Sequence, residues 1–195
     1  MATSPKVCIS IPCKGNVRAE TMDWTLRTFV QLAPDVEVQI VSENVPLEAA
    51  RNVQARRFLA SDCTHLFLLD SDCVPQIGTI QKLLSYELPI VAAPHPTRKG
   101  ADRMVMALVR SNGHYATHLP TLGLQKVDAV GGSGLLIERR VMEEYGPPWF
   151  RCEYDDRGFL HRSEDFWFCE RAKERGHEVW ADYGLVQQHI REVAV

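Results

Sequence analysis

The chain has 195 residues, of which 45% are hydrophobic and 24% are charged, and its formal net charge is -3 at pH 7. This length suits a single domain with a sizeable core, and the composition is that of an ordinary globular protein. The small negative charge excludes a global attraction to nucleic acid or to an anionic membrane, although it leaves room for a local basic patch that binds DNA or RNA.

The cysteines and the amino-terminal residues indicate a cytoplasmic protein. No two cysteines form a C-x-x-C pair, and no close spacing of cysteine and histidine suggests zinc. Residues 1–6 lack the apolar region of a signal peptide, and no apolar run approaches the ~18 residues that span a bilayer. We therefore expect no stable membrane insertion and six reduced cysteines, which are Cys8, Cys13, Cys63, Cys73, Cys152 and Cys169.

Apolar strands and amphipathic helices alternate in the first half of the chain. The predicted strands are residues 7–11, 36–41, 65–69 and 89–93, and the predicted helices are residues 21–32, 44–60 and 76–86. Asn44 is the expected cap of the second helix, with Pro46 in its first turn. This order predicts an α/β domain with a mostly parallel central sheet flanked by helices.

The second half of the chain is less regular. The predicted strands are residues 104–109, 127–130, 135–137 and 178–181, followed by an extended piece at 185–190. A short helix is expected to end at Tyr145, and Ser163 is expected to cap a helix that ends near Gly176. Residues 131–134 form a glycine-rich break, and residues 154–158 form a polar loop.

Two carboxylates, Asp70 and Asp72, follow a nearly continuous apolar strand. In an open α/β sheet, ligands bind at the carboxyl ends of the strands. Two acids one residue apart in a turn can hold one hard cation, Mg²⁺ or Mn²⁺, which would neutralise a diphosphate. The alternative is an aspartate-rich turn that only ends the strand.

A second pair of acids, Glu164 and Asp165, follows Ser163 at the start of a predicted helix. Acids are preferred in the first turn of any helix, which is a purely structural explanation. Asp165 also shares one helical face with Cys169 and Ala172, so it points toward the apolar side. A carboxylate in that position is costly unless it is used or paired, so Asp165 could serve as a general base for an acceptor hydroxyl.

Weaker signals come from isolated residues. His189 could complete a mixed carboxylate and imidazole metal site, and Lys14 and Arg18 could contact phosphate. Residues 95–100 form a polar, basic loop that could close over a diphosphate. Each of these is equally explained by an ordinary surface position. Residues 131–134 do not match G-x-G-x-x-G, and no G-x-x-x-x-G-K-[ST] motif is present.

These segments, in this order, resemble the GT-A nucleotide-diphospho-sugar transferases, especially the family-2-like glycosyltransferases. Residues 7–12 resemble the opening strand whose end holds the donor nucleobase. Residues 50–52 (Ala-Arg-Asn) and 67–72 (Phe-Leu-Leu-Asp-Ser-Asp) are similar to the A-R-N helix and the D-x-D strand. Residues 131–137 resemble the glycine-bearing segment beside the acceptor, and residues 163–180 resemble the E-D helix and the strand after it.

The resemblance implies a role for each matched residue. Asp72 would bind Mn²⁺ or Mg²⁺ directly, Asp70 would contact the ribose or the water on the metal, and His189 would complete the metal site. Asp165 would be the base of an inverting mechanism, and Glu164 would contact the acceptor or the donor. Residues expected on the nucleotide-sugar side are Pro12, Arg51, Asn52, Asp70 and Ser71; those on the acceptor side are Gly132, Ser133 and Gly134.

The same resemblance implies the partners and the organisation of the chain. The donor would be a UDP- or GDP-linked sugar, and the acceptor a hydroxyl group on a glycan, a small molecule or a modified nucleic acid. Residues 1–195 would form one glycosyltransferase-like domain, with a nucleotide-sugar-binding half at 1–100 and an acceptor-side half at 101–195. Few residues follow His189, so we expect the acceptor itself, or a second copy in a homo-oligomer, to supply part of the acceptor site.

Two alternatives stay open. Residues 70–74 (Asp-Ser-Asp-Cys-Val) also fit the D-x-D-x-[TV] motif of haloacid-dehalogenase-like phosphatases, in which Asp70 would be a nucleophile that forms an aspartyl-phosphate. Against this, two strand–helix units precede the motif, whereas that family usually opens with it. The second alternative is a protein that binds a nucleotide sugar without catalysis, for which Asp165 would be dispensable.

Overall fold

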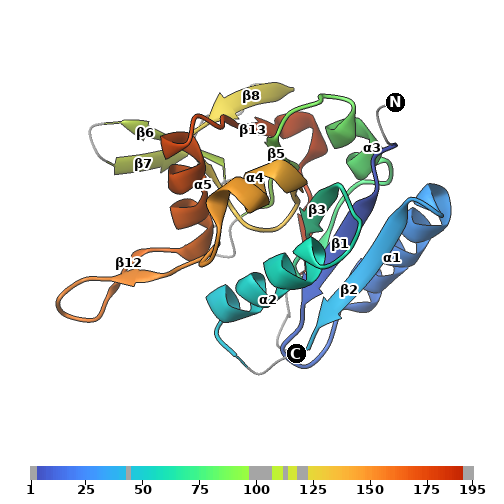
Figure 1. The fold of residues 1–195 in the computed structure, drawn as a ribbon, viewed down its shortest axis with the longest axis horizontal. Coiled ribbons are helices and arrows are strands. Elements are labelled where there is room, and N and C mark those ends of the chain that lie inside the picture. The colour runs from blue at the N-terminus through green and yellow to red at the C-terminus, as the bar shows by residue number, and fades with distance from the viewer. Residues whose placement is uncertain (1–3, 43–44, 97–106, 112–113, 118–122, 191–195) are drawn as a thin grey trace.

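The computed structural model describes residues 4–42, 45–96, 107–111, 114–117 and 123–190. A seven-stranded sheet runs through the centre of the molecule, with helices on both of its faces (Figure 1). Its strands, in spatial order, are β2 (Val36–Val41), β1 (Val7–Pro12), β3 (His65–Leu68), β10 (Leu135–Glu138), β5 (Ile90–Ala92), β13 (Val179–Asp182) and β8 (Leu124–Val127).

Most strands of this mixed sheet run in one direction. β1 is parallel to β2 and β3, while β10 is antiparallel to both of its neighbours, β3 and β5. β5 therefore points the same way as β3, and β13 is parallel to β5, so only β10 and β8 among the seven are reversed. The predicted α/β fold with a mostly parallel central sheet flanked by helices is confirmed.

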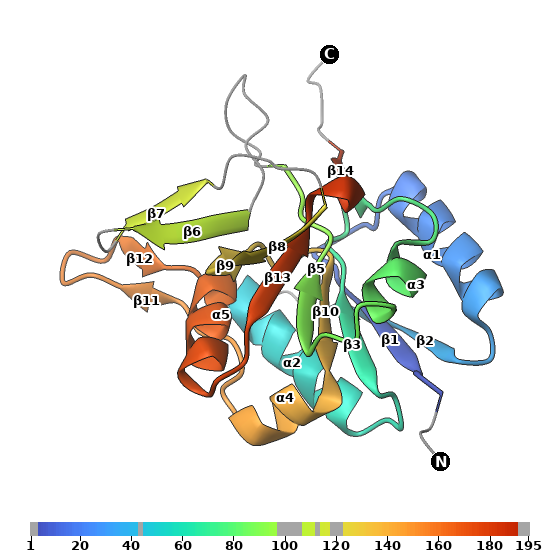
Figure 2. The ribbon, with the colours of Figure 1, turned by 90° about the horizontal axis from the view of Figure 1, so that it is seen from above.

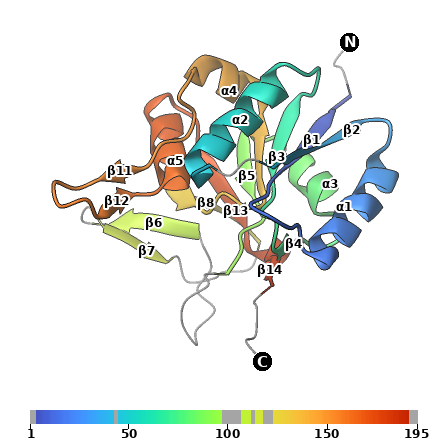
Figure 3. The ribbon, with the colours of Figure 1, turned by 90° about the horizontal axis from the view of Figure 1, so that it is seen from below.

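Two hydrophobic cores cover the two faces of the sheet because side chains alternate along each strand. Leu66 and Leu68 pack into one core, whereas Phe67 and Leu69 pack into the other. Figure 3 shows the resulting helix layers on either side of the sheet. The first core lies against α2 (Leu47–Leu59), α4 (Arg139–Tyr145) and α5 (Glu164–Glu174), and the second lies against α1 (Ala19–Leu32) and α3 (Thr79–Leu84).

Three smaller sheets surround the central one. Two of them, β7-β6-β9 and the hairpin β11-β12, lie at the end of the molecule away from α1 (Figure 2). The third joins β4 and β14 near the carboxyl ends of β1 and β3 (Figure 3). The strand bounds are β4 (Cys73–Val74), β6 (Ala107–Ser111), β7 (His114–Thr117), β9 (Ala129–Val130), β11 (Glu153–Tyr154), β12 (Leu160–Arg162) and β14 (Gln188–His189); a 3₁₀ turn spans Tyr183–Leu185.

The structure differs from the predicted elements at several boundaries. The strand expected at 127–130 is divided at Asp128, because β8 joins the central sheet while β9 pairs with β6. The loop expected at 154–158 lies mostly in the turn of the β11-β12 hairpin. Helix α2 begins at Leu47 with Pro46 as its N-cap, and the expected cap Asn44 lies outside the described residues.

All six cysteines lie in the described ranges, and each is free. Within those ranges, no helix is long and apolar enough to cross a bilayer.

Gly134 is the position at which β10 enters the sheet between β3 and β5. Its N–H donates to the Leu68 carbonyl at 2.7 Å, and its carbonyl accepts from the Ala93 N–H at 2.9 Å. Its φ of +78° lies in the left-handed region that favours glycine. A Cβ at this position would overlap the Ala93 carbonyl oxygen and the Gln187 amide, so both the backbone angle and the packing require glycine.

We predict that Gly134→Ala lowers the free energy of unfolding by about 2–4 kcal/mol, because the new methyl group meets backbone that cannot move aside. Gly78→Ala is the matched control, since Gly78 also has a positive φ, +85°, in the left-handed region, but its Cβ would meet nothing within 4 Å. That control should lose only about 1 kcal/mol. Urea unfolding of both variants measures the difference, and equal losses would contradict the packing argument.

Candidate functional site

A cleft lies beyond the carboxyl ends of β1 and β3, which are adjacent and parallel. The chain leaves β1 through Pro12 to Lys14 and leaves β3 through Asp70 to Asp72, so both turns open at one edge of the sheet. The start of α2 closes the third side, and the cavity measures about 290 Å³. Its lining residues are Pro12, Cys13, Lys14, Val45, Pro46, Leu47, Ala50, Asp70, Ser71 and Asp72.

Asp70 forms an ion pair with a buried arginine of α2. The Arg51 side chain is 1% exposed, and its Nη2 donates to Asp70 Oδ1 at 2.5 Å. Burial of Asp70 opposes its ionisation, but the charge of Arg51, together with His95 and His189, outweighs burial and holds the pKa of Asp70 below its usual range. Asp70 is therefore a carboxylate at neutral pH.

Asp72 lies beside His189, although 117 positions separate them in the sequence. The Ile190 N–H donates to the Asp72 carbonyl at 2.8 Å, and β14 pairs with β4, so the backbone of the last described residues is held against this turn. His189 Nε2 stands 3.4 Å from Asp72 Oδ2. Oxygen atoms of Asp70 and Asp72 lie within 4.8 Å of each other and of the Cys73 thiol. Carboxylate oxygens joined by one imidazole fit Mn²⁺ or Mg²⁺.

The Asp165 carboxylate is buried at the start of α5 and accepts hydrogen bonds at both oxygens. Oδ1 accepts from the Phe166 N–H at 2.9 Å and from the Ser163 hydroxyl, and Oδ2 accepts from the Gly132 N–H at 3.2 Å. Ser163 occupies the expected N-cap position, but its hydroxyl is donated to Asp165 and makes no cap hydrogen bond to a backbone N–H. The serine therefore orients the carboxylate.

Glu164 and Asp165 both hold their protons more tightly than ordinary carboxyl groups. Burial, followed by the charge of Asp165, raises the pKa of Glu164 to about 7. Burial also raises the pKa of Asp165, while the Ser163 hydroxyl, the Phe166 N–H and the Arg51 charge act against that rise. Arg51 thus acts electrostatically on Asp70 and on both acids of α5.

The glycine-bearing segment connects the two acid pairs. Ser133 Oγ accepts from the Asp70 N–H at 3.1 Å, while the preceding residue, Gly132, donates to Asp165. A Cβ on Gly132 would lie 2.9 Å from Arg51 Nη2, so glycine is needed to admit the guanidinium. Gly132, Ser133 and Gly134 are all buried within this network.

Some of the remaining predicted residues line the cleft, and others do not. Pro12, Lys14 and Ser71 line the cleft, and the Arg18 N–H donates to the Ser71 carbonyl at 2.9 Å. Asn52 is not among the residues that line it. The Asn52 amide instead joins α2 to the segment after α4, accepting from the Trp149 and Phe150 N–H groups and donating to the Phe150 and Glu48 carbonyls. In the predicted basic loop, residues 97–100 lie outside the described ranges.

Sequence reasoning missed Gln187 altogether, and it missed Cys73 and His95 as metal ligands although it placed residues 95–100 in a loop that could close over a diphosphate. Gln187 is buried and donates to the Ser133 carbonyl at 3.1 Å and to the Ala93 carbonyl at 2.5 Å. The edge of the sheet that carries Asp72 and His189 is called the metal edge below. Cys73, in β4, and His95, in the residues after β5, lie beside it. Cys73 follows Asp72 directly and Gln187 lies two positions before His189, and this closeness in the sequence carries little information by itself.

No family model and no curated protein matches the sequence. The fold is similar to A197 from STIV, with a TM-score of 0.70 and 20% identity over 96% of this chain and 86% of that chain. It is similar to GalNAc-T7 in complex with UDP, GalNAc and Mn²⁺, with a TM-score of 0.60 and 15% identity over 97% of this chain and 44% of that chain. It is also similar to S. aureus TarS 1–349 in complex with UDP-GlcNAc, with a TM-score of 0.52 and 9% identity over 97% of this chain and 60% of that chain.

These similarities show that the fold is GT-A-like. The chain spans less than half the length of the GalNAc-T7 chain and about three fifths of the TarS chain, so it matches only part of either one.

We predict that the contribution of Glu164 to stability falls as the pH rises from about 4.5 to about 7, because folded Glu164 keeps its proton in this range while the unfolded chain releases it. The loss should be about 1–3 kcal/mol. Glu164→Gln should flatten this slope and gain stability relative to the parent above pH 7. Glu143→Gln, at an exposed carboxylate of α4, should keep the parent slope. Urea unfolding at several pH values measures both, and identical slopes for parent and Glu164→Gln would contradict the burial argument.

Proposed function

We propose that the protein is a metal-dependent glycosyltransferase that moves a sugar from a nucleoside-diphosphate sugar to a hydroxyl acceptor. One observation carries this proposal: Asp70, Asp72 and His189 meet beside the cleft, and the buried base candidate Asp165 is joined to the same turn through Gly132 and Ser133. The similarity to structures that hold UDP, Mn²⁺ and UDP-GlcNAc supports the same activity for this chain.

The donor nucleoside would occupy the cleft between β1, β3 and α2. Pro12 and the start of α2 provide an apolar wall for a base, and Ser71 provides polar atoms for a ribose. Lys14 lines the same cleft, so its ammonium group could contact a phosphate oxygen. A UDP- or GDP-linked sugar fits this arrangement, with the diphosphate directed toward Asp72.

Asp72, Asp70 and His189 would hold Mn²⁺ or Mg²⁺. The ion would neutralise the diphosphate during binding and as it leaves. The Arg51 charge keeps Asp70 ionised, so the carboxylate can serve the metal or the ribose at neutral pH. Arg51 therefore supports donor binding through Asp70, without lining the cleft itself.

Asp165 would act as the general base of an inverting transfer. Its carboxylate would accept the proton of the acceptor hydroxyl as that oxygen attacks the anomeric carbon and the nucleoside diphosphate leaves. Burial raises its pKa, which makes it a stronger base than an exposed aspartate once it is deprotonated. Glu164, beside it, would contact the acceptor or the donor sugar.

The phosphatase alternative is less well supported by the contacts of Asp70. A nucleophilic aspartate needs a carboxylate oxygen that can attack phosphorus, and with Oδ1 of Asp70 held by Arg51 only Oδ2 is left for that role. A radiolabelled phosphoenzyme at Asp70 would support that alternative. A protein that binds donor without catalysis would bind UDP or GDP with metal yet transfer no sugar.

We predict that UDP or GDP binds with Mn²⁺ or Mg²⁺ and binds much more weakly after chelation, because the diphosphate needs the ion between itself and the carboxylates. Asp72→Asn should weaken nucleotide binding in the presence of metal to the level that the parent shows after chelation. Asp62→Asn is the matched control, since Asp62 lies before β3 and is paired with Lys6. Isothermal titration calorimetry measures each case; binding that is absent for every nucleotide, or independent of metal, would overturn the donor assignment.

We predict that Asp165→Asn lowers turnover roughly 10²–10⁴-fold, the usual contribution of a general base, while the Kd for UDP with Mn²⁺ stays unchanged. Asp156→Asn, in the exposed turn of the β11-β12 hairpin, should keep parental turnover. Thermal-shift screening of nucleotide sugars with Mn²⁺ identifies the donor for this assay. Parental turnover in Asp165→Asn would remove this residue from the mechanism.

A further inference from the structure

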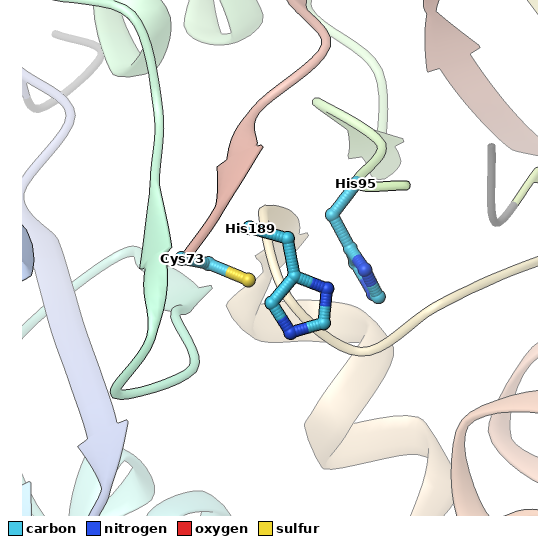
Figure 4. Close-up of side chains that lie close together, drawn as sticks. All are labelled: Cys73, His95 and His189. Carbon is cyan, nitrogen blue, oxygen red and sulfur yellow. The ribbon is translucent and has the colours of Figure 1, made fainter. Parts of the chain in front are cut away.

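A second set of metal-binding side chains lies beside the two aspartates. Cys73, His95 and His189 each offer one ligand atom, and these three atoms lie within 4.8 Å of one another. Figure 4 shows the His189 ring between the Cys73 thiol and the His95 ring. The two rings meet edge to face, with their centroids 5.4 Å apart. Three separate parts of the chain therefore bring sulfur and imidazole ligands to one place.

Backbone pairing fixes the position of the thiol relative to one imidazole. Cys73 in β4 and His189 in β14 are directly opposed partners in an antiparallel ladder. Opposed residues of such a pair project to the same face, with their Cβ atoms about 5 Å apart. The approach of Cys73 to His189 is therefore set by strand pairing and does not depend on two flexible side chains meeting by chance.

One backbone carbonyl orients both histidines. Nδ1 of His189 lies 3.0 Å from the Pro96 carbonyl oxygen, and Nδ1 of His95 lies 3.2 Å from the same oxygen. A carbonyl oxygen only accepts, so Nδ1 of each ring donates to it, and Nε2 is the ring nitrogen left to bind a metal. Metal-binding histidines commonly donate their second ring N–H to a backbone carbonyl in this way.

Asp72 adds a fourth ligand beside the same group. Its Oδ2 is 3.4 Å from His189 Nε2, and its Oδ1 is 4.0 Å from the Cys73 sulfur. One thiolate, two imidazoles and one carboxylate give four ligands of the kinds that tetrahedral zinc takes. Mg²⁺ and Mn²⁺ prefer oxygen, so the sulfur and the second imidazole favour a softer ion.

We propose that Cys73, His95 and His189, with Asp72, bind a divalent ion of the zinc class. Binding exchanges the S–H bond of Cys73 for a metal–sulfur bond, and the proton leaves to solvent. This inference rests on the proposed function in one respect: Asp72 and His189 belong to both ligand sets. The zinc-class ion and the Mn²⁺ of the donor site therefore exclude each other, and zinc competes with Mn²⁺-dependent donor binding.

Co²⁺ tests this proposal because it takes zinc sites and is coloured. Titration of the nucleotide-free full chain should produce sulfur-to-cobalt charge-transfer absorption in the near ultraviolet and the strong visible bands of a tetrahedral site. Cys73→Ser should abolish the charge-transfer band and weaken Co²⁺ binding by roughly 100-fold, whereas His95→Gln should weaken binding and alter the visible bands with the sulfur band retained. Cys169→Ser, at another buried thiol, should match the parent.

Circular dichroism of each variant confirms folding, so a lost band reports the ligand. A sulfur band that persists in Cys73→Ser and disappears in Cys63→Ser would overturn the proposal, since it would place the ion at the Glu37, Asp62 and Cys63 group. Absence of any sulfur band in the parent would also overturn it. Metal-dependent UDP binding is measured separately: if that fails while the cobalt band persists, only the proposed transferase function fails.

Discussion

The ion pair between Arg51 and Asp70 holds the candidate site together. Arg51 is almost fully buried, and a buried guanidinium requires a nearby negative charge. Its field reaches Asp70 at the end of β3 and also Glu164 and Asp165 at the start of α5. One positive charge cannot balance the partly exposed Asp70 and the two buried carboxylates of α5. Asp70, in direct contact, is therefore kept ionised, whereas the acids of α5 retain their protons to higher pH.

The glycine-bearing segment before β10 makes this arrangement rigid. In this segment Gly132 donates to Asp165, and Ser133 accepts from the Asp70 N–H. The chain then enters the sheet between β3 and β5 at Gly134. Gly132 admits the Arg51 guanidinium, and Gly134 admits Gln187, so any side chain at either position would push apart the groups that the segment joins. Gly132 and Ser133, just before the antiparallel strand β10, therefore join the turn that carries Asp70 to the base candidate Asp165 through two hydrogen bonds.

The metal edge itself is assembled from distant parts of the chain. β14 places His189 opposite Cys73 and beside Asp72, while the residues after β5 bring His95 to the same point. Oxygen ligands on one side and sulfur with a second imidazole on the other favour different ions. The two proposed ligand sets share His189 and Asp72, so the two ions would compete for this edge.

The fold class, most strands and helices, and the turn that carries Asp70 and Asp72 can be predicted from the sequence alone. These features follow from local apolar periodicity and from capping and turn residues, which are visible within a few positions. The long-range contacts were needed to show that β10 is reversed within the sheet, that Asn52 joins α2 to the segment after α4, and that Ser163 orients Asp165. They also show that Cys73 and His95 lie beside His189. Those outcomes depend on which distant segments pair and which side chains share one buried charge, and no local pattern encodes either.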